Sequence, residues 1–288
     1  MSALLSIRST PPQRLADRLA IEGAIAPDVL LEVEKFHRQS SLLRRSRFGM
    51  DMTVFHDRGL LKELERRQLR VSEHHAGFIS DTGELGARCL LRKRSQRNFA
   101  PVCELQYVTL RKLLFHSFAN ASAADGGSSY PCPSAGAVYA VNVFAAALVP
   151  VRGASFAPDS VVHLDHRACE LFRMPGCTAR KAAYVCLDGE PGGVSDSFAN
   201  AALMLAYVID LELSTLRYAE RGYRFSLIEA GSMAQQAALV GQSLGLRSCL
   251  FGGFPDAELS SALGLNARKM LPCLVQFFGL PMDQGRYD

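Results

Sequence analysis

The chain has 288 residues, enough for one large domain or for one domain with a smaller attachment. Hydrophobic residues make up 48% of it and charged residues 21%, a composition typical of a globular protein with a substantial core. The net charge of +4 is too small to indicate a nucleic-acid binder, and no apolar run is long enough to span a bilayer. The N-terminus carries no cleavage signature, so we expect a cytoplasmic protein that binds neither nucleic acid nor membrane.

The first 85 residues differ in character from the rest. Residues 26–72 read as charged helical segments, and the first of them, PDVLLEVEKFHRQ, starts with a proline, which the first turn of a helix tolerates. Its spacing predicts Val33 and Phe36 on one apolar side. The turn-rich stretch 81–88 marks a boundary. The sequence therefore predicts a helical N-terminal accessory region, residues 1–85, and a larger domain, residues 86–288.

Helix and strand patterns are mixed within the larger domain. Residues 108–120 predict an amphipathic helix with one apolar side. Residues 137–151 and 270–280 are typical of buried strands, and 161–172 begins as a strand and then turns. The segment 201–210 is apolar throughout, so its periodicity fits a buried strand and a buried helix equally well. The pattern predicts a mixed α and β domain.

A long helix is predicted over residues 225–244, and Gly245 follows it in the position favoured for a left-handed C-terminal cap. A stripe of small side chains runs along one face at spacings of three and four residues: Gly231, Ala234, Ala238, Gly241 and Gly245. Such a stripe allows another backbone or a flat ligand to approach closely. This helix is either a central core helix or part of a dimer interface, and the two readings are compatible.

Three short segments have compositions suited to a ligand. In RKRSQRNF (92–99), two guanidinium groups and a hydroxyl within four residues suit a phosphate, although a solvated basic run is the alternative. YPCPSAGAVY (130–139) is a small-residue loop whose backbone amides could face a ligand ring. CLFGGF (249–254) holds a Gly-Gly pair where backbone N–H groups could approach a cofactor. HLDH (163–166) has metal-binding residue types but spacing for only a partial site, so we expect no metal.

Together, in this order, the segments resemble the nitroreductase superfamily of FMN proteins. More narrowly, they resemble the SagB-type, or McbC-like, azoline dehydrogenases that finish thiazole- and oxazole-modified microcins. The resemblance is carried by RSQRNF (94–99), PSAGAVY (133–139), RYAERGYRFSLIEAGSMAQQ (217–236), LGLRSCLFGGF (244–254) and LVQFFG (274–279). It implies an α+β fold with a mixed, mostly antiparallel sheet flanked by helices, in which residues 201–210 form a strand. It also implies FMN bound at a homodimer interface.

The resemblance further implies roles for individual residues. The FMN phosphate would be held by Arg94, Ser95 and Arg97. The isoalloxazine ring would be contacted, from the other subunit, by Pro133, Ser134 and Ala135. The reactive flavin nitrogen would be faced by Gly252 and Gly253.

The implied reaction is the two-electron oxidation of an azoline to an aromatic azole, within a ribosomally made precursor peptide. It needs a base for the acidic ring proton and a hydride acceptor, which is the flavin. The family has a Lys-Tyr pair where this chain has Arg217 and Tyr218. Because Arg cannot accept a proton, we expect Tyr218 to act as the base and Arg217 to stabilise its phenolate. The implied partners are the precursor peptide, a cyclodehydratase and its peptide-recognition subunit.

Two other functions stay open. One is an NAD(P)H-dependent nitroreductase acting on small molecules, which the specific block 217–236 disfavours. The other is a non-catalytic subunit that binds FMN and holds a peptide-modification complex together. The exchange of the family's Lys for Arg217 keeps this second alternative open.

Overall fold

The computed structural model describes residues 27–40, 91–119, 121–122, 128–166, 169–187, 198–218 and 220–282. The helices are α2 (Pro27–Ser40), α4 (Tyr107–Phe118), α5 (Ala179–Leu187), α7 (Leu211–Tyr218), α8 (Glu220–Ser243) and α9 (Asp256–Ala262), with a short 3-10 turn, η4 (Ala135–Ala137). The strands are β1 (Phe99–Ala100), β2 (Leu105–Gln106), β3 (Ala121–Ser122), β4 (Ser128–Ser129), β5 (Val141–Ala147), β6 (Val151–Arg152), β7 (Ser160–Asp165), β8 (Glu170–Thr178), β9 (Leu203–Asp210), β10 (Arg247–Phe251) and β11 (Met270–Pro281). None of the helices in these ranges is long and apolar enough to cross a bilayer.

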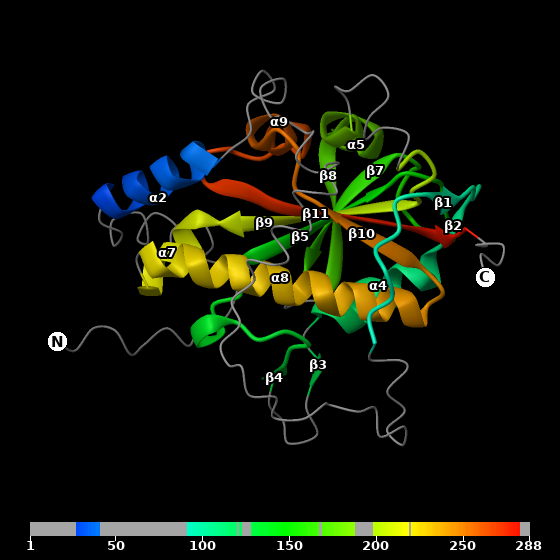
Figure 1. Ribbon diagram of the computed structural model, residues 1–288, viewed down its shortest axis with the longest axis horizontal. Coiled ribbons are helices and arrows are strands. Elements are labelled where there is room, and N and C mark those ends of the chain that lie inside the picture. Colours follow the sequence, from blue (N-terminus) through cyan, green and yellow to red (C-terminus); the bar gives the residue numbers. More distant parts are fainter. Residues whose placement is uncertain are drawn as a thin grey trace, which may run out of the picture.

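A seven-stranded sheet forms the centre of the fold (Figure 1). Its strand order is β1-β11-β9-β5-β7-β8, and β10 pairs with β11 as well. Each neighbouring pair in this sheet is antiparallel. The short β2 and β6 form a separate parallel pair. This arrangement confirms the predicted α+β fold with a mixed, mostly antiparallel sheet.

Strand β9 explains why the segment 201–210 shows no clear periodicity. Its odd-numbered side chains, from Leu203 to Ile209, belong to a hydrophobic core shared with α4 and α8. Its even-numbered side chains, from Met204 to Val208, belong to a second core shared with α5 and α9. Because successive side chains of a strand point to opposite faces, a strand covered on both sides is apolar at every position. The strand implied by the resemblance is confirmed.

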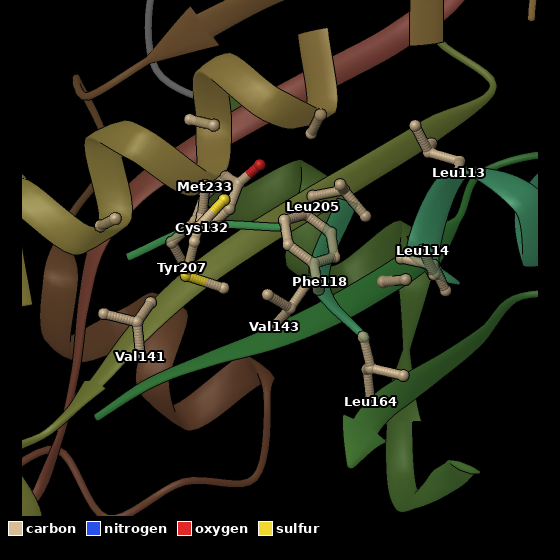
Figure 2. Close-up of a cluster of buried hydrophobic side chains, with 14 of the residues drawn as sticks. Leu113, Leu114, Phe118, Cys132, Val141, Val143, Leu164, Leu205, Tyr207 and Met233 are labelled. Carbon is tan, nitrogen blue, oxygen red and sulfur yellow. The ribbon is translucent and has the colours of Figure 1, made fainter. Parts of the chain in front are cut away.

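The helices form a layer on each face of the sheet. In Figure 1, α4 and α8 cover one face, while α5 and α9 lie beyond the other. Figure 2 shows the core under α4 and α8, where Leu113 and Phe118 of α4 and Met233 of α8 lie over Leu205 and Tyr207 of β9. The rings of Phe118 and Tyr207 meet edge to face, with centroids 6.0 Å apart. The amphipathic helix predicted over residues 108–120 is therefore confirmed by α4 and its buried side.

Helix α8 is longer than predicted and begins at Glu220 rather than near Phe225. Gly245 has a φ of +81°, which confirms the left-handed cap. The small residues of the stripe do not all face the same environment. A Cβ on Gly241 would lie 2.8 Å from the ring of Phe278, whereas a Cβ on Gly231 would meet no atom within 4 Å. One side of α8 is thus a core surface, and the side at Gly231 is open within the protomer.

The strand predicted over residues 137–151 is shorter in the structure. β5 starts only at Val141, because the chain before it is not extended. Gly136, Ala137 and Tyr139 have φ values of 60°, 56° and 52°, in the left-handed region. The prediction for 161–172 is confirmed: β7 ends at Asp165 and the chain turns into β8.

The N-terminal region is described at α2 only, which confirms the first predicted helix. The rest of residues 1–85, including the predicted boundary at 81–88, lies outside the described residues. The buried side chains among residues 31–37 of α2 are Val33 and His37. Phe36, which the spacing placed on the apolar side, is 57% exposed.

Candidate functional site

The Arg217–Tyr218 pair lies in the last turn of α7, directly before α8. The two helices meet there at very short range. Gly222 of α8 lies so close to α7 that a Cβ on it would be 1.8 Å from the carbonyl oxygen of Ser214. Beside this contact, Ser226 Oγ donates a hydrogen bond to Ser214 Oγ at 3.0 Å. We call residues 211–226 the α7–α8 corner; its close packing holds α7 against α8.

Tyr218 is half-buried, and its ring meets that of Phe225 edge to face, with centroids 5.2 Å apart. Tyr218 lines a small cavity with Ser134 and Ala135. The structure thus brings together the candidate base and the loop expected to contact the flavin ring. The side chain of Arg217, the other catalytic candidate, lies outside the described residues.

Glu229 holds the Pro133–Ala135 segment in place, and sequence reasoning assigned it no role. It is 5% exposed, on the face of α8 that lines the same cavity. Its Oε2 accepts a hydrogen bond from Ser134 Oγ, and its Oε1 accepts one from Val141 N at 3.0 Å. Ser134 Oγ in turn accepts a hydrogen bond from Tyr139 N at 2.8 Å. One carboxylate therefore closes the loop from both ends.

This loop is a strained part of the backbone. Ala137 and Tyr139 have positive φ, which costs non-glycine residues about 1 kcal/mol or more each. Such strain persists only where surrounding contacts determine the conformation. The hydrogen bonds of Ser134 and Glu229 are those contacts. The Ser134 hydroxyl is thus engaged in closing its own loop.

We expect Glu229→Ala to destabilise the fold by about 2–4 kcal/mol, because it leaves the Ser134 hydroxyl and the Val141 N–H without their acceptor. Glu229→Gln keeps an oxygen that accepts the hydrogen bond from Val141 N, and its amide N–H can donate one to Ser134 Oγ. The loss of stability in Glu229→Gln should therefore be much smaller. Urea denaturation of both variants measures the difference. Equal losses in the two variants would show that hydrogen bonding at this position contributes little.

The pH dependence of Glu229→Gln provides a second measurement. Burial raises the pKa of the Glu229 carboxyl above its ordinary value of 4.5, against the opposing hydrogen bonds from Ser134 and Val141. A carboxyl with a raised native pKa binds more protons when folded than when unfolded, so its contribution to stability falls as pH rises from that ordinary value. Wild-type stability relative to Glu229→Gln should therefore decrease as pH rises from about 4.5.

The expected phosphate ligands lie in an extended segment along the C-terminal end of α8. Lys93 N donates to Gln242 Oε1 at 2.8 Å, and Gln96 N donates to the carbonyl of Ser248 at 3.1 Å. These bonds hold the segment to α8 and β10 through its backbone. Arg94 and Arg97 are exposed. Two exposed guanidinium groups on an anchored backbone fit a phosphate group.

Ser95 is the third expected phosphate ligand. Its Oγ accepts a hydrogen bond from the Arg92 guanidinium, so a further cation lies beside it.

Gly252 and Gly253 follow the end of β10. A Cβ on Gly252 would meet no atom within 4 Å, whereas one on Gly253 would lie 3.1 Å from the Phe251 ring. The backbone at Gly252 is therefore open to a flat group, as expected of a segment that faces a flavin.

The two groups of candidate residues do not meet within one protomer. Glu229 holds the loop that Tyr218 faces, and Gln242 holds the Arg94–Arg97 segment. Because an α-helix rises about 1.5 Å per residue, these anchor points lie about 20 Å apart along α8. The structure of the single chain thus shows two partial sites at different positions along one helix.

In the HLDH segment (163–166), His163 packs against neighbouring strand residues. His163 Nε2 lies 3.1 Å from Asn142 Oδ1, and its ring packs on Phe144 with centroids 4.9 Å apart. Across the described ranges, no group of three His, Cys, Asp or Glu side chains could hold a metal ion.

Comparison with protein families decides which fold family this is. The model of the nitroreductase family matches residues 92–279. The chain belongs to the nitroreductase family. Membership places it among oxidoreductases, and it confirms the superfamily recognised from the motifs.

Individual relatives narrow the placement within the nitroreductase family. The Microcin B17-processing protein McbC of Escherichia coli is 30% identical over 256 residues, covering 88% of this chain and 91% of McbC. The putative nitroreductase MJ1384 of Methanocaldococcus jannaschii is 27% identical over 189 residues, covering 63% of this chain and 85% of the relative. The McbC match spans 256 residues, which is more than the range 86–288 holds. The match therefore extends into the N-terminal region.

Solved structures agree with this placement. A chain of the E. coli microcin synthetase McbBCD complex with truncated pro-MccB17 bound matches with a TM-score of 0.76 at 27% identity, covering 92% of this chain and 97% of that one. A putative nitroreductase from Ralstonia eutropha matches with a TM-score of 0.55 at 20% identity, covering 72% and 89%, and shows the fold alone. The predicted McbC-like resemblance is confirmed.

Proposed function

We propose that this protein is an FMN-dependent azoline dehydrogenase that oxidises thiazolines or oxazolines in a ribosomally made precursor peptide. The observation that carries the proposal is the cavity that joins Tyr218 to Ser134 and Ala135. Tyr218 and the loop expected to contact the flavin ring line this one small cavity, which supports a shared role for them. The match to McbC over nearly the whole chain supports the same substrate class.

The residues present fit FMN. Arg94 and Arg97 would bind its phosphate through charge-assisted hydrogen bonds, with Ser95 between them. The open backbone at Gly252 would lie against the ring system. When bound, FMN supplies the hydride acceptor for the oxidation.

Tyr218 removes the proton in this proposal. Its hydroxyl, ionised to the phenolate, takes the acidic proton from the azoline ring carbon that carries the peptide backbone. Arg217 would supply a permanent positive charge that stabilises the phenolate and the negative charge that develops on the ring. The loop closed by Glu229 keeps the opposite wall of the cavity in place.

A homodimer would bring the two partial sites together. The Arg94–Arg97 segment of one protomer would face the Ser134 loop and Tyr218 of its partner, since one protomer holds them apart along α8. The open side of α8 supports such contact: Ile228 is 67% exposed there, and Gly231 offers a flat approach. In the cell, we expect this cytoplasmic dimer to act beside a cyclodehydratase and its peptide-recognition subunit, which supply the azoline-bearing peptide.

An anaerobic visible spectrum of the purified protein tests the proposed function. Addition of an azoline-containing peptide should bleach a bound-flavin spectrum, and mass spectrometry should show one azole formed per flavin reduced. The same peptide with Ala in place of its Cys, Ser and Thr residues cannot form azolines, so it serves as the control and should leave the spectrum unchanged. Partner proteins are included, so that the peptide is presented as in a complex.

Two outcomes would overturn the proposal. Bleaching by NAD(P)H, but not by the azoline peptide, would favour a nitroreductase acting on small molecules. A flavin spectrum that neither donor bleaches, with partners present, would favour a non-catalytic subunit that binds FMN within a modification complex.

A further inference from the structure

Helix α2 belongs to the N-terminal region, yet it is packed directly on the α7–α8 corner. Among side chains 31–37, Val33 is 4% exposed and His37 is 7% exposed, while Leu31 and Phe36 are more than half exposed. Phe36 still meets the ring of Tyr223 edge to face, with centroids 5.9 Å apart. Among the described side chains of α2, His37 is therefore the buried polar one, and its contacts add specificity to the docking.

The His37 imidazole joins three elements of the fold. Its Nδ1 lies 2.6 Å from the hydroxyl of Tyr223, which is 4% exposed on α8. Its Nε2 lies 3.7 Å from Oδ1 of Asp256, the first residue of α9. One side chain from α2 therefore contacts α8 on one side and α9 on the other.

The surroundings define the proton positions. Burial raises the pKa of the Tyr223 hydroxyl, so it stays protonated and donates to Nδ1. Burial also lowers the pKa of His37, although the Asp256 carboxylate opposes this. An imidazole that accepts this bond at Nδ1 carries its proton on Nε2, which lies 3.7 Å from Asp256 Oδ1.

Both residues that His37 contacts, Tyr223 and Asp256, are close in sequence to segments of the candidate site. Tyr223 follows Gly222, whose close approach to Ser214 sets the position of α7 and hence of Tyr218. Asp256 stands at the end of the short segment that begins with Gly252. The imidazole therefore lies between the corner that carries the candidate base and the segment expected to face the flavin.

We propose that His37 is a positioning residue that ties the α7–α8 corner to the start of α9, and thereby makes the N-terminal region a structural part of the catalytic unit. The catalytic consequence rests on the proposed azoline oxidation, whereas the structural link does not. The nitroreductase family model begins at residue 92, whereas the match to McbC extends into the N-terminal region to which His37 belongs.

Hydrogen exchange on the full-length protein tests the link without relying on activity. His37→Ala removes both contacts, and Tyr223→Phe removes only the hydroxyl while keeping the ring. Each should speed amide exchange in two separate stretches, residues 211–226 and 252–256, with the smaller effect in Tyr223→Phe. Leu31→Ala, on the exposed side of the same helix, is the matched control and should leave both stretches unchanged. Faster exchange confined to α2 would overturn the proposal.

Single-turnover kinetics tests the consequence for the site. With the azoline peptide, Tyr223→Phe should lower the saturating rate of flavin bleaching by about three- to tenfold, the equivalent of one net hydrogen bond, while the half-saturating peptide concentration and the FMN content stay unchanged. The side-chain oxygen in His37→Asn can accept a hydrogen bond from the Tyr223 hydroxyl, so this variant should recover part of the rate lost in His37→Ala. Loss of FMN at an unchanged rate per flavin would indicate a merely structural role and overturn the positioning proposal.

The two measurements separate the hypotheses. A wild-type protein that does not oxidise the peptide contradicts the proposed function, and the exchange experiment still decides whether His37 makes the link. Coupled exchange in 211–226 and 252–256 without azoline oxidation would support the link alone.

Discussion

Tyr218→Phe should slow azoline oxidation by about 10²–10⁴-fold, the usual contribution of a positioned general base, while FMN content and unfolding temperature stay close to wild type. The substitution removes one hydroxyl from a half-buried side chain and keeps the ring contact with Phe225. The loss should therefore fall on the chemical step. Single-turnover bleaching of the flavin at saturating peptide measures it.

Tyr184→Phe is the matched control for this substitution. It makes the same chemical change on α5, at a side chain that is 61% exposed on the other face of the sheet, and should leave the rate unchanged. Arg217→Lys is informative beside it, because it restores the pair found in the family. A large gain in rate would show that a lysine base is better and that Tyr218 assists it, whereas little change would support Tyr218 as the base. A Tyr218→Phe variant with wild-type rate would contradict the assignment outright.

The fold could be predicted where an apolar pattern had one structural meaning. Residues 108–120 have a single apolar side, and α4 buries that side against the sheet. For β9 the pattern was insufficient, because a strand covered on both faces carries no period, and only the resemblance identified it. The long helix was predicted only from residue 225. In the structure α8 already starts at Glu220, and Gly222 in this added turn serves the contact with α7.

Loop conformation was the least predictable part. The left-handed backbone at Ala137 and Tyr139 is disfavoured for non-glycine residues, so local preference argued for continuing the strand. A contact remote in sequence overrides that preference: Glu229, 95 positions from Ser134, holds the loop. Hydrophobic periodicity carries no information about such a pair.

The candidate site shows the same division. The motifs indicated which segments take part, and the structure brings Tyr218 into one cavity with Ser134 and Ala135. The residues that hold those segments were missed. Glu229 and His37 are single polar residues on largely buried helix faces, and the sequence signal for each is only a polar residue at a buried position. Their partners cannot be read from that signal, since His37 and Tyr223 are 186 positions apart.

Gly222→Ala should be the most damaging single-methyl substitution in α8. Its Cβ would lie 1.8 Å from the Ser214 carbonyl oxygen, a backbone atom that cannot rotate away, so α7 and α8 must separate. We expect a loss of about 3 kcal/mol, which for a domain of this size corresponds to a fall in unfolding temperature of about 6–12 °C. Because a displacement of about 1 Å at a catalytic group can cost 10²-fold in rate, azoline oxidation should fall by a similar factor in the fraction that remains folded.

Gly231→Ala is the control that separates this clash from a general effect of alanine in the helix. Its Cβ would meet no atom of the protomer within 4 Å, and alanine stabilises a helix interior by up to about 1 kcal/mol relative to glycine. Within the described part of the protomer nothing opposes this gain, so thermal unfolding should rank Gly231→Ala well above Gly222→Ala, which should fall well below wild type. Equal stability of the two variants would show that α7 moves away from α8 at little cost. The corner could then not be the element that fixes Tyr218, and the positioning argument built on His37 would lose its basis with it.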